Sequence, residues 1–123
     1  MKFVYLMMGG ALGTTARYAL SAVVHRLAGT GFPYGTLLVN LLGCFILGFF
    51  VTIFEKKFTL STNMVLLATT GFCGAFTTFS TFMLETSYLL KDGELMRALG
   101  NVLLSVIVGL LVFRLGLLLG EVF

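Results

Sequence analysis

The chain has 123 residues, of which 59% are hydrophobic and only 11% are charged, with a formal net charge of +3 at pH 7. This composition lies outside the range of ordinary soluble domains and indicates an integral membrane protein. The sequence has no Gly-rich phosphate loop ending in Lys-Ser or Lys-Thr, no HExxH motif and no run of basic residues. It therefore indicates no enzyme, no nucleotide-driven pump and no nucleic-acid-binding protein, and its positive charges are expected to meet lipid headgroups.

Four apolar blocks predict four transmembrane helices that together occupy nearly the whole chain. We place these helices at about 3–27, 33–55, 62–90 and 94–121. Each block reaches the roughly 20 residues that a helix needs to cross a bilayer. Because only short turns separate the blocks, the predicted fold is all-α, with one domain of four antiparallel transmembrane helices over residues 1–123.

The lysines and arginines divide evenly between the two faces of this predicted bundle. One face carries Lys2, Lys56, Lys57 and Arg114, and the opposite face carries Arg17, Arg26, Lys91 and Arg97. Because an uneven count orients a membrane protein, an even count favours insertion in both orientations and pairing of the two forms as an antiparallel dimer. The alternative is that a weak bias or a partner sets a single orientation.

Small residues recur at spacings that suit close helix approach. They are Gly9 and Gly13 in the first predicted helix and Gly116 and Gly120 in the fourth. A bundle of four helices packs its centre solid, so we expect a solute route to form between subunits, with these glycines at the contacts.

The third predicted helix contains the most unusual stretch, GFCGAFTTFSTF at 71–82. A continuous helix over 62–90 would be about 43 Å long at 1.5 Å per residue, against a hydrocarbon core of about 30 Å. Gly71 and Gly74 are the residues expected to let the backbone leave helical geometry. Since a break within a membrane persists only where its backbone groups are buried or line a wet cavity, we predict a break at about 73–78 that forms an ion site.

Two phenylalanines after this break suggest an anion. Phe79 and Phe82 lie three residues apart, on one face of the predicted helix. A phenyl ring has a positive edge that can solvate an anion, and the hydroxyls of Thr78, Ser80 and Thr81 add hydrogen-bond donors. The alternative is that the two rings serve packing alone, which is the commoner use of this spacing.

Asn40 is the one fully polar side chain in the apolar stretch 35–48. An unpaired carboxamide in hydrocarbon costs several kcal/mol, so Asn40 must have a partner. It either bonds across helices as a structural link or presents its NH₂ group to a permeating anion. On the fourth helix Asn101 and Ser105, one turn apart, form a second polar track, although a serine alone commonly bonds its own helix backbone.

Three segments of the chain resemble the CrcB/Fluc family of fluoride channels. They are GGALGTTARY at 9–18, GTLLVNLLGCFILG at 35–48 and GFCGAFTTFSTF at 71–82, of which the last is highly specific. The resemblance implies a passive, fluoride-selective channel that exports cytoplasmic fluoride through two pores of an antiparallel homodimer. It also implies a multi-pass protein of a bacterial inner membrane.

The resemblance assigns roles to five residues by motif position. Asn40 corresponds to the pore asparagine, and Phe79 and Phe82 correspond to the aromatic box whose ring edges face fluoride. The backbone carbonyls of Gly74 and Thr77 from both subunits would hold a structural Na⁺ on the dimer axis.

Further residues follow the same resemblance. Ser80 and Thr81 would supply hydroxyls along the ion track, and Glu85 would lie near the pore mouth. Asn101 and Ser105 would line the pore on the fourth helix, where the match is looser.

The sequence departs from the commoner family pattern at two positions, Ala75 in place of a second adjacent glycine and Thr14 in place of alanine. Neither departure removes a proposed ion contact. Arg17 is the main candidate for a positive field, because a buried arginine in a membrane is costly and is usually paired or functional. Its alternative roles are a snorkelling side chain or a structural pairing.

Two other functions compete with a fluoride channel. A small proton-coupled multidrug-type exporter would match the size, but it needs a membrane-embedded carboxylate, and Glu85 lies toward one end of the third helix. A structural membrane subunit, in which the polar residues only join helices, would transport nothing.

Overall fold

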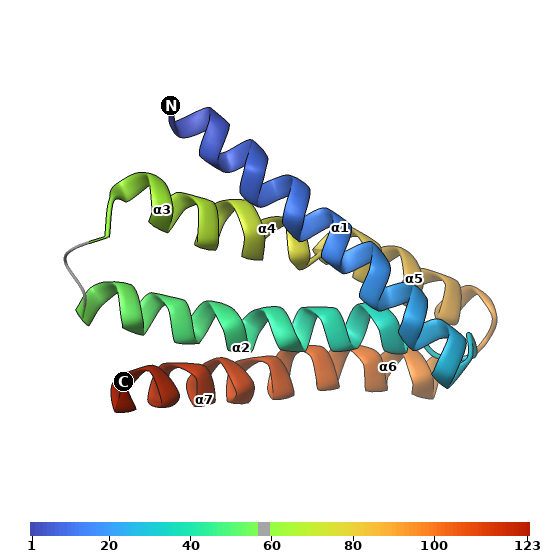
Figure 1. Cartoon of the computed structure of the whole chain (residues 1–123). Helices are drawn as coiled ribbons and strands as arrows, with labels where there is room; N and C mark the ends of the chain where they lie inside the picture. The colour runs from blue at the N-terminus through green and yellow to red at the C-terminus, as the bar shows by residue number, and fades with distance from the viewer. Residues whose placement is uncertain (57–59) are drawn as a thin grey trace.

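The computed structural model describes residues 1–56 and 60–123, which form helices joined by short turns, with no strand among them (Figure 1). The first two helical rods are α1 (Lys2–Ala28) and α2 (Tyr34–Lys56). The third rod comprises α3 (Thr62–Leu66), η1 (Leu67–Cys73), α4 (Gly74–Phe76) and α5 (Phe79–Lys91). The fourth rod comprises α6 (Leu95–Leu103), η2 (Leu104–Val108) and α7 (Gly109–Val122). The prediction of four helices in an all-α fold is confirmed, whereas Lys57, one of the charges counted above, lies outside the described residues.

Local chemistry explains where several of these rods begin and end. The Ser61 side chain accepts a hydrogen bond from the backbone N–H of Met64 at 3.2 Å and so caps α3. Gly29 (φ 84°) follows α1, and Gly93 (φ 77°) lies in the turn between α5 and α6. Both take the left-handed conformation that glycine adopts without steric cost, so each reverses the chain after a helix.

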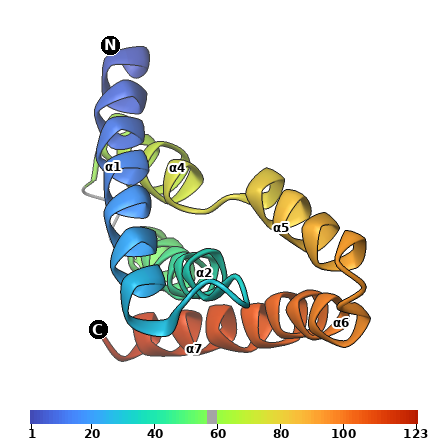
Figure 2. The same ribbon diagram turned by 90° about the vertical axis from the view of Figure 1, so that its right-hand side faces the viewer.

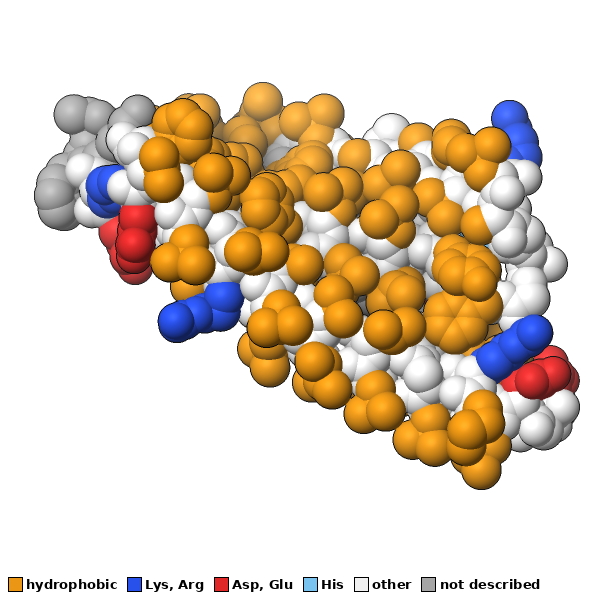
Figure 3. All heavy atoms as spheres, turned by 90° about the horizontal axis from the view of Figure 1, so that it is seen from below, with side chains coloured by type: hydrophobic (Ala, Val, Ile, Leu, Met, Phe, Trp, Pro, Cys, Tyr) orange, Lys and Arg blue, Asp and Glu red, His pale blue; other side chains and the backbone are white. Residues whose placement is uncertain are grey.

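Three rods are long and apolar enough to cross a membrane, namely Tyr34–Lys56, Thr62–Lys91 and Leu95–Val122. The 27 residues of α1 also suffice in length, but glycine, threonine, serine and arginine lower its hydropathy, so a crossing by α1 stays a prediction. Large apolar side chains are exposed on every rod, and in Figure 3 they cover most of one face, with charges mainly toward the two ends. The chain is a multi-pass membrane protein.

Helices α2 and α7 run side by side in Figure 1, lie next to each other again in Figure 2, and pack closely through glycine. A Cβ atom on Gly48 would collide with the carbonyl oxygen of Phe113, and one on Gly116 would collide with the carbonyl oxygen of Phe45. A Cβ atom on Gly120 would lie 2.6 Å from the Cβ of Thr52. The two backbones therefore touch directly along this contact.

Helix α1 crosses the third rod and packs on η1 in the same way. A Cβ atom on Gly9 would collide with the carbonyl oxygen of Leu67, and one on Gly13 would collide with that of Phe72. These glycines and those of α7 thus hold helices of one chain together. The expectation that they bring subunits together is wrong, because their faces are already filled by backbone of the same chain.

The third rod is interrupted at Thr77 and Thr78, the last two residues of the stretch where the sequence predicts a break. Their backbones are extended, with φ −91° and ψ 156° at Thr77 and φ −149° and ψ 113° at Thr78. Gly74 keeps helical angles (φ −61°, ψ −38°) and Gly71 lies within η1, so the expectation that these glycines host the break is wrong. Gly71 is needed for a different reason, since a Cβ atom there would lie 3.1 Å from Gly9 Cα.

Threonine suits this interruption because its branched side chain favours extended backbone and its hydroxyl can replace lost backbone partners. The Thr77 hydroxyl donates to the carbonyl oxygen of Cys73 at 3.0 Å. The Thr78 hydroxyl accepts from the backbone N–H of Thr81 at 3.3 Å and so caps the start of α5. The two hydroxyls close the helix ends on either side of the break.

Candidate functional site

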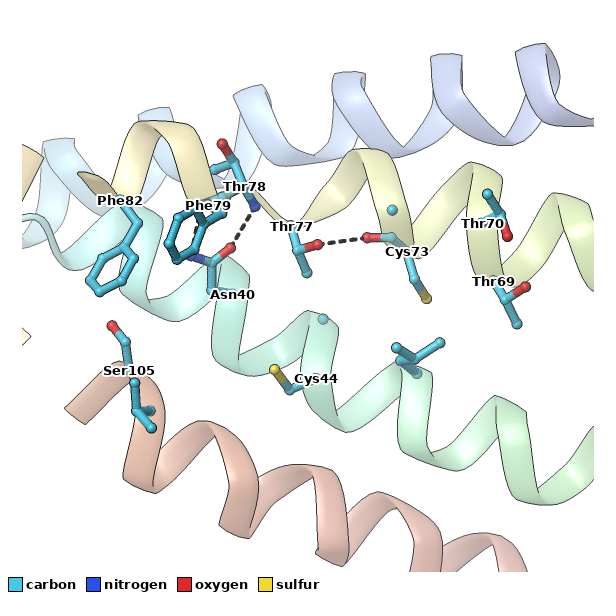
Figure 4. A pocket seen from close by; sticks show the side chains of 14 residues that line it. Asn40, Cys44, Thr69, Thr70, Cys73, Thr77, Thr78, Phe79, Phe82 and Ser105 are labelled. Carbon is cyan, nitrogen blue, oxygen red and sulfur yellow. Dashed lines mark hydrogen bonds between the residues drawn. The ribbon is translucent and has the colours of Figure 1, made fainter. Parts of the chain in front are cut away.

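A pocket of about 490 Å³ opens between α2, the interrupted third rod and η2 (Figure 4). It gathers residues from three stretches that are far apart in the sequence, within 40–47, 69–82 and 105–106. The lining residues are Asn40, Gly43, Cys44, Leu47, Thr69, Thr70, Cys73, Gly74, Thr77, Thr78, Phe79, Phe82, Ser105 and Val106. None of these lining residues carries a formal charge, so the pocket offers an ion only neutral groups.

Asn40 on α2 is bonded to both backbone groups of Thr78. Its Oδ1 atom accepts from the Thr78 N–H at 2.7 Å, and its Nδ2 group donates to the Thr78 carbonyl at 3.1 Å. The carboxamide therefore pairs with the broken backbone as a neighbouring strand would, and it satisfies two groups that the interruption frees. Because the NH₂ group has two hydrogens, one N–H is left to act as a donor in the pocket.

Phe79 and Phe82 both line the pocket and meet edge to face. Their ring centroids lie 5.9 Å apart, with 68° between the ring planes. Phe82 is 6% exposed, whereas Phe79 is 72% exposed within the single chain. The fixed Phe82 ring therefore orients a second ring that lies at the open side of the pocket.

The hydroxyl groups of the pocket differ in what they can still donate. Thr69 Oγ1 donates to the Val65 carbonyl at 2.7 Å, and the hydroxyl of Thr77 is used in the same way within its own helix. Ser105 Oγ is buried and has no hydrogen-bond partner among residues 1–56 and 60–123. Figure 4 shows this serine reaching from the fourth rod across the pocket toward Phe82, so its hydroxyl is available to a bound ion.

Three predicted pore residues do not line this pocket. Ser80 and Thr81 lie in the first turn of α5, outside the lining set. Asn101 is 2% exposed, and its Nδ2 group donates to Thr86 Oγ1 at 3.0 Å in a buried contact between α6 and α5. This bond holds α5 against the fourth rod.

The two residues predicted to hold Na⁺ lie on either side of a helix end. Gly74 is exposed on α4, and Thr77 begins the extended stretch one turn later. With ψ 156° the Thr77 carbonyl leaves the helical hydrogen-bonding pattern, and backbone carbonyl oxygens are ligands that hard cations accept. The residues present therefore fit a cation held by backbone oxygens.

Arg17 and Glu85 lie outside the pocket. Arg17 Nε donates to the Ala75 carbonyl at 3.0 Å, one of the last carbonyls before the break, and so closes the end of α4. The sequence left three roles open for Arg17, a positive field, a snorkelling side chain or a structural pairing, and this bond is a structural pairing. Glu85 lies one turn beyond Phe82 on α5, in a second pocket near the end of the bundle.

The pocket also contains residues that the sequence reasoning did not select. Cys44 lies four residues after Asn40, and Thr69 and Cys73 precede Thr77 at intervals of four, so helical spacing from the chosen residues could have identified them. No spacing in the sequence predicted the π-helical geometry of η1 and η2. Both segments contribute to the pocket wall, as π-helical turns often do at functional sites.

Comparisons with known proteins match nearly the whole chain. A relative from Dehalococcoides mccartyi named "Fluoride-specific ion channel FluC" is 44% identical over 120 residues, covering 98% of this chain and 92% of the relative. Relatives of the same name from Desulforapulum autotrophicum (42% identity, 98% and 96% covered) and Magnetococcus marinus (44% identity, 98% and 98% covered) are similar. The family model described as "CrcB-like protein, Camphor Resistance (CrcB)" matches residues 4–117, and the chain therefore belongs to the CrcB family.

Proposed function

We propose that this chain forms a passive, fluoride-selective channel that lets cytoplasmic fluoride leave the cell and so lowers its toxicity. The observation that carries the proposal is a single uncharged pocket where Asn40, bonded to the broken backbone at Thr78, lies beside Phe79, Phe82 and Ser105. Full-length relatives named as fluoride-specific ion channels support the assignment of the ion.

The chemistry of the pocket suits a small, strongly hydrated anion. Fluoride that enters a narrow apolar space loses water, and hydrogen-bond donors must replace that water at each step. Donors in the pocket include the remaining Asn40 N–H, the unpartnered Ser105 hydroxyl and the positive edges of Phe79 and Phe82. The Thr78 hydroxyl accepts from the Thr81 N–H and keeps its own hydrogen for an ion. Because no formal positive charge lines the pocket, the ion is solvated without being trapped.

The same lining argues for a channel over a proton-coupled exporter. Exchange of a proton for substrate requires a carboxylate at the substrate site, and the described lining of this pocket includes none. Ion movement through the pocket then follows the electrochemical gradient alone, without a catalysed reaction.

We further propose that the functional unit is an antiparallel homodimer with two pores. Phe79 is 72% exposed at the open side of the pocket, although it is a large apolar ring in the proposed ion path. A second copy in the inverted orientation would cover this ring and complete the wall. The even distribution of lysine and arginine between the two faces supports insertion in both orientations.

A structural Na⁺ between the two copies belongs to this proposal. The Thr77 carbonyl, freed by the extended backbone, and the carbonyl of Gly74 are the oxygens of this chain that would hold it. When bound, the ion would supply a fixed positive charge that holds the two broken rods together.

A transport assay distinguishes the three candidate functions. Purified protein is reconstituted in liposomes loaded with potassium fluoride, and efflux is followed with a fluoride electrode after valinomycin is added. A channel releases fluoride at a rate set by the voltage, with or without a protonophore. A strict requirement for a proton gradient would identify an exporter, and no release above protein-free liposomes would identify a structural subunit.

Orientation is tested separately in intact cells. A cysteine at the exposed position Glu121, in a background with Cys44 and Cys73 replaced by alanine, is labelled with a membrane-impermeant maleimide. Dual insertion predicts that about half of the protein is labelled from outside. Labelling of all or none of the protein would show a single orientation.

A further inference from the structure

A second pocket, of about 580 Å³, lies at the end of the bundle opposite the two termini, where α1, α5 and α6 end or begin (Figure 1). It is lined by the end of α1, the turn after it, the last two turns of α5, the turn at 92–94 and the start of α6. Its lining includes one histidine and five charged residues, namely His25, Glu85, Lys91, Asp92, Glu94 and Arg97.

Two polar atoms of this pocket are buried without a hydrogen-bond partner in the described chain, His25 Nδ1 and Glu85 Oε1. They come from α1 and α5, and both residues line the same space. On its other side the imidazole lies against α2 at Gly35, where a Cβ atom would be 3.2 Å from Nε2. Both residues thus line a space large enough for water or an ion, and each carries a polar atom that no group of the described chain satisfies.

The second pocket lies along the same face of α5 as the first. Phe82 lines the first pocket and Glu85 the second, and residues three apart share a helix face. Next to Glu85, the bond from Asn101 to Thr86 holds α5 against the fourth rod. The second pocket is therefore placed one turn beyond Phe82, on the side of α5 that the first pocket uses.

The formal charge of this pocket depends on His25. Three carboxylates (Glu85, Asp92 and Glu94) face two permanent positive charges (Lys91 and Arg97), which gives −1 when the imidazole is neutral. Arg97 is partly engaged, since its Nη1 donates to the Gly31 carbonyl at 3.1 Å and its Nε lies 3.8 Å from Glu94. Protonation of His25 brings the formal charge of the pocket to zero.

We propose that this pocket is a mouth of the fluoride route and that His25 sets its charge, so that protonation of the imidazole speeds the passage of fluoride. This inference rests on the proposed function. A net negative mouth lowers the local concentration of an anion, and removing that charge raises it. Histidine is the residue type whose charge changes between pH 5 and 8, and His25 is the only histidine of the chain.

The test is fluoride efflux from proteoliposomes at equal internal and external pH between 5.5 and 8, with the leak of protein-free liposomes subtracted at each pH. Efflux through the wild-type protein is expected to rise about two- to fivefold from pH 8 to pH 5.5, the size expected for one charge near the ion path. In His25→Gln the same efflux is expected to be flat over this range. Glu85→Gln removes one carboxylate from the pocket and is expected to raise efflux at pH 8.

The outcomes separate this inference from the proposed function. A pH profile that is the same in wild type and His25→Gln would overturn the role of His25 while leaving the channel intact. If His25→Gln is not recovered as a folded protein by size exclusion, Glu85→Gln decides, and unchanged efflux at pH 8 would overturn the inference. Complete loss of protein-dependent efflux at every pH in the wild type would contradict the proposed function itself.

Discussion

The carboxamide of Asn40 bonds both backbone groups of Thr78, with contacts of 2.7 Å and 3.1 Å. One side chain thereby satisfies the N–H and the carbonyl that the interrupted third rod would otherwise leave unpaired. The two alternatives for Asn40, a structural link and an ion contact, are compatible in this geometry. The link uses one hydrogen of the NH₂ group and leaves the other in the pocket.

Asn40→Ala should lower both stability and flux. Two part-buried backbone groups of Thr78 lose their partner, and each group left unsatisfied costs up to about 1–3 kcal/mol. We expect a lower melting temperature in detergent and at least a tenfold loss of fluoride efflux. Asn63→Ala is the matched control, because Asn63 on α3 makes no side-chain hydrogen bond within the described residues. Wild-type efflux in Asn40→Ala would show that neither bond matters for conduction.

Asn40→Asp separates the two bonds. The carboxylate still accepts from the Thr78 N–H, but it cannot donate to the Thr78 carbonyl or to an anion, and it adds a negative charge to an uncharged pocket. Relative to Asn40→Ala, we expect Asn40→Asp to lower the fluoride efflux more and the melting temperature less. If Asn40→Asp lowered efflux and melting temperature by the same amounts as Asn40→Ala, Asn40 would act only as a structural link.

Phe79→Ile and Phe82→Ile test the ring edges. Each substitution keeps an apolar side chain and removes the positive edge, so we expect efflux to fall about tenfold or more. Because Phe79 is 72% exposed in the single chain, Phe79→Ile should change the free energy of unfolding of the monomer by less than about 0.5 kcal/mol. Phe82 is buried, so Phe82→Ile should lower that free energy by more.

Phe54→Ile is the control for these two substitutions. Phe54 stacks on Phe50 with ring centroids 5.4 Å apart, outside the pocket. Its replacement should leave efflux unchanged. If efflux survived in both Phe79→Ile and Phe82→Ile, the rings would serve packing alone.

Gly9→Ala and Gly10→Ala form a matched pair on α1. A Cβ atom at Gly9 meets the Leu67 carbonyl, so α1 and η1 must separate, which should cost about 2 kcal/mol or more. A Cβ atom at Gly10 has no neighbour within 4 Å, and alanine there should be neutral or stabilise the helix by up to about 1 kcal/mol. Thermal unfolding in detergent compares the two, and equal stabilities would contradict the close contact of α1 with η1.

Removal of Na⁺ tests the proposed cation site. Purification and assay with N-methyl-D-glucamine in place of Na⁺ should reduce efflux and shift the protein from dimer to monomer, since the Gly74 and Thr77 oxygens would lose the charge between them. Restored Na⁺ should restore both. Dimers with full efflux after exhaustive removal of Na⁺ would argue against the ion.

The sequence was most informative where a residue type conflicts with its surroundings. A carboxamide in hydrocarbon must find a partner, and the structure places Asn40 in one pocket with Phe79, Phe82 and Ser105, all of which were selected from the sequence. These choices could be made because polarity and helical spacing are visible without tertiary structure. Fluoride itself came from the resemblance to a known family, since residue types alone leave the anion open.

Other features could not be predicted because they depend on packing. Glycine was expected to host the break, but close contact with α1 holds Gly71 in helical geometry and two threonines take the extended conformation. Asn101 was expected in the pore, and it lies outside the pocket in a bond with Thr86 that only the approach of α5 to α6 creates. Helical spacing alone cannot show whether Asn101 faces the pocket or Thr86.

We expect the pocket beside the Asn40–Thr78 contact to conduct fluoride and to exclude larger halides. The most direct test compares the initial rates of fluoride and chloride efflux from the same proteoliposomes at the same voltage, for wild type and Phe79→Ile. We expect rapid fluoride release, chloride release no faster than from protein-free liposomes, and loss of the fluoride signal in Phe79→Ile. Equal release of the two halides, or none of either, would contradict it.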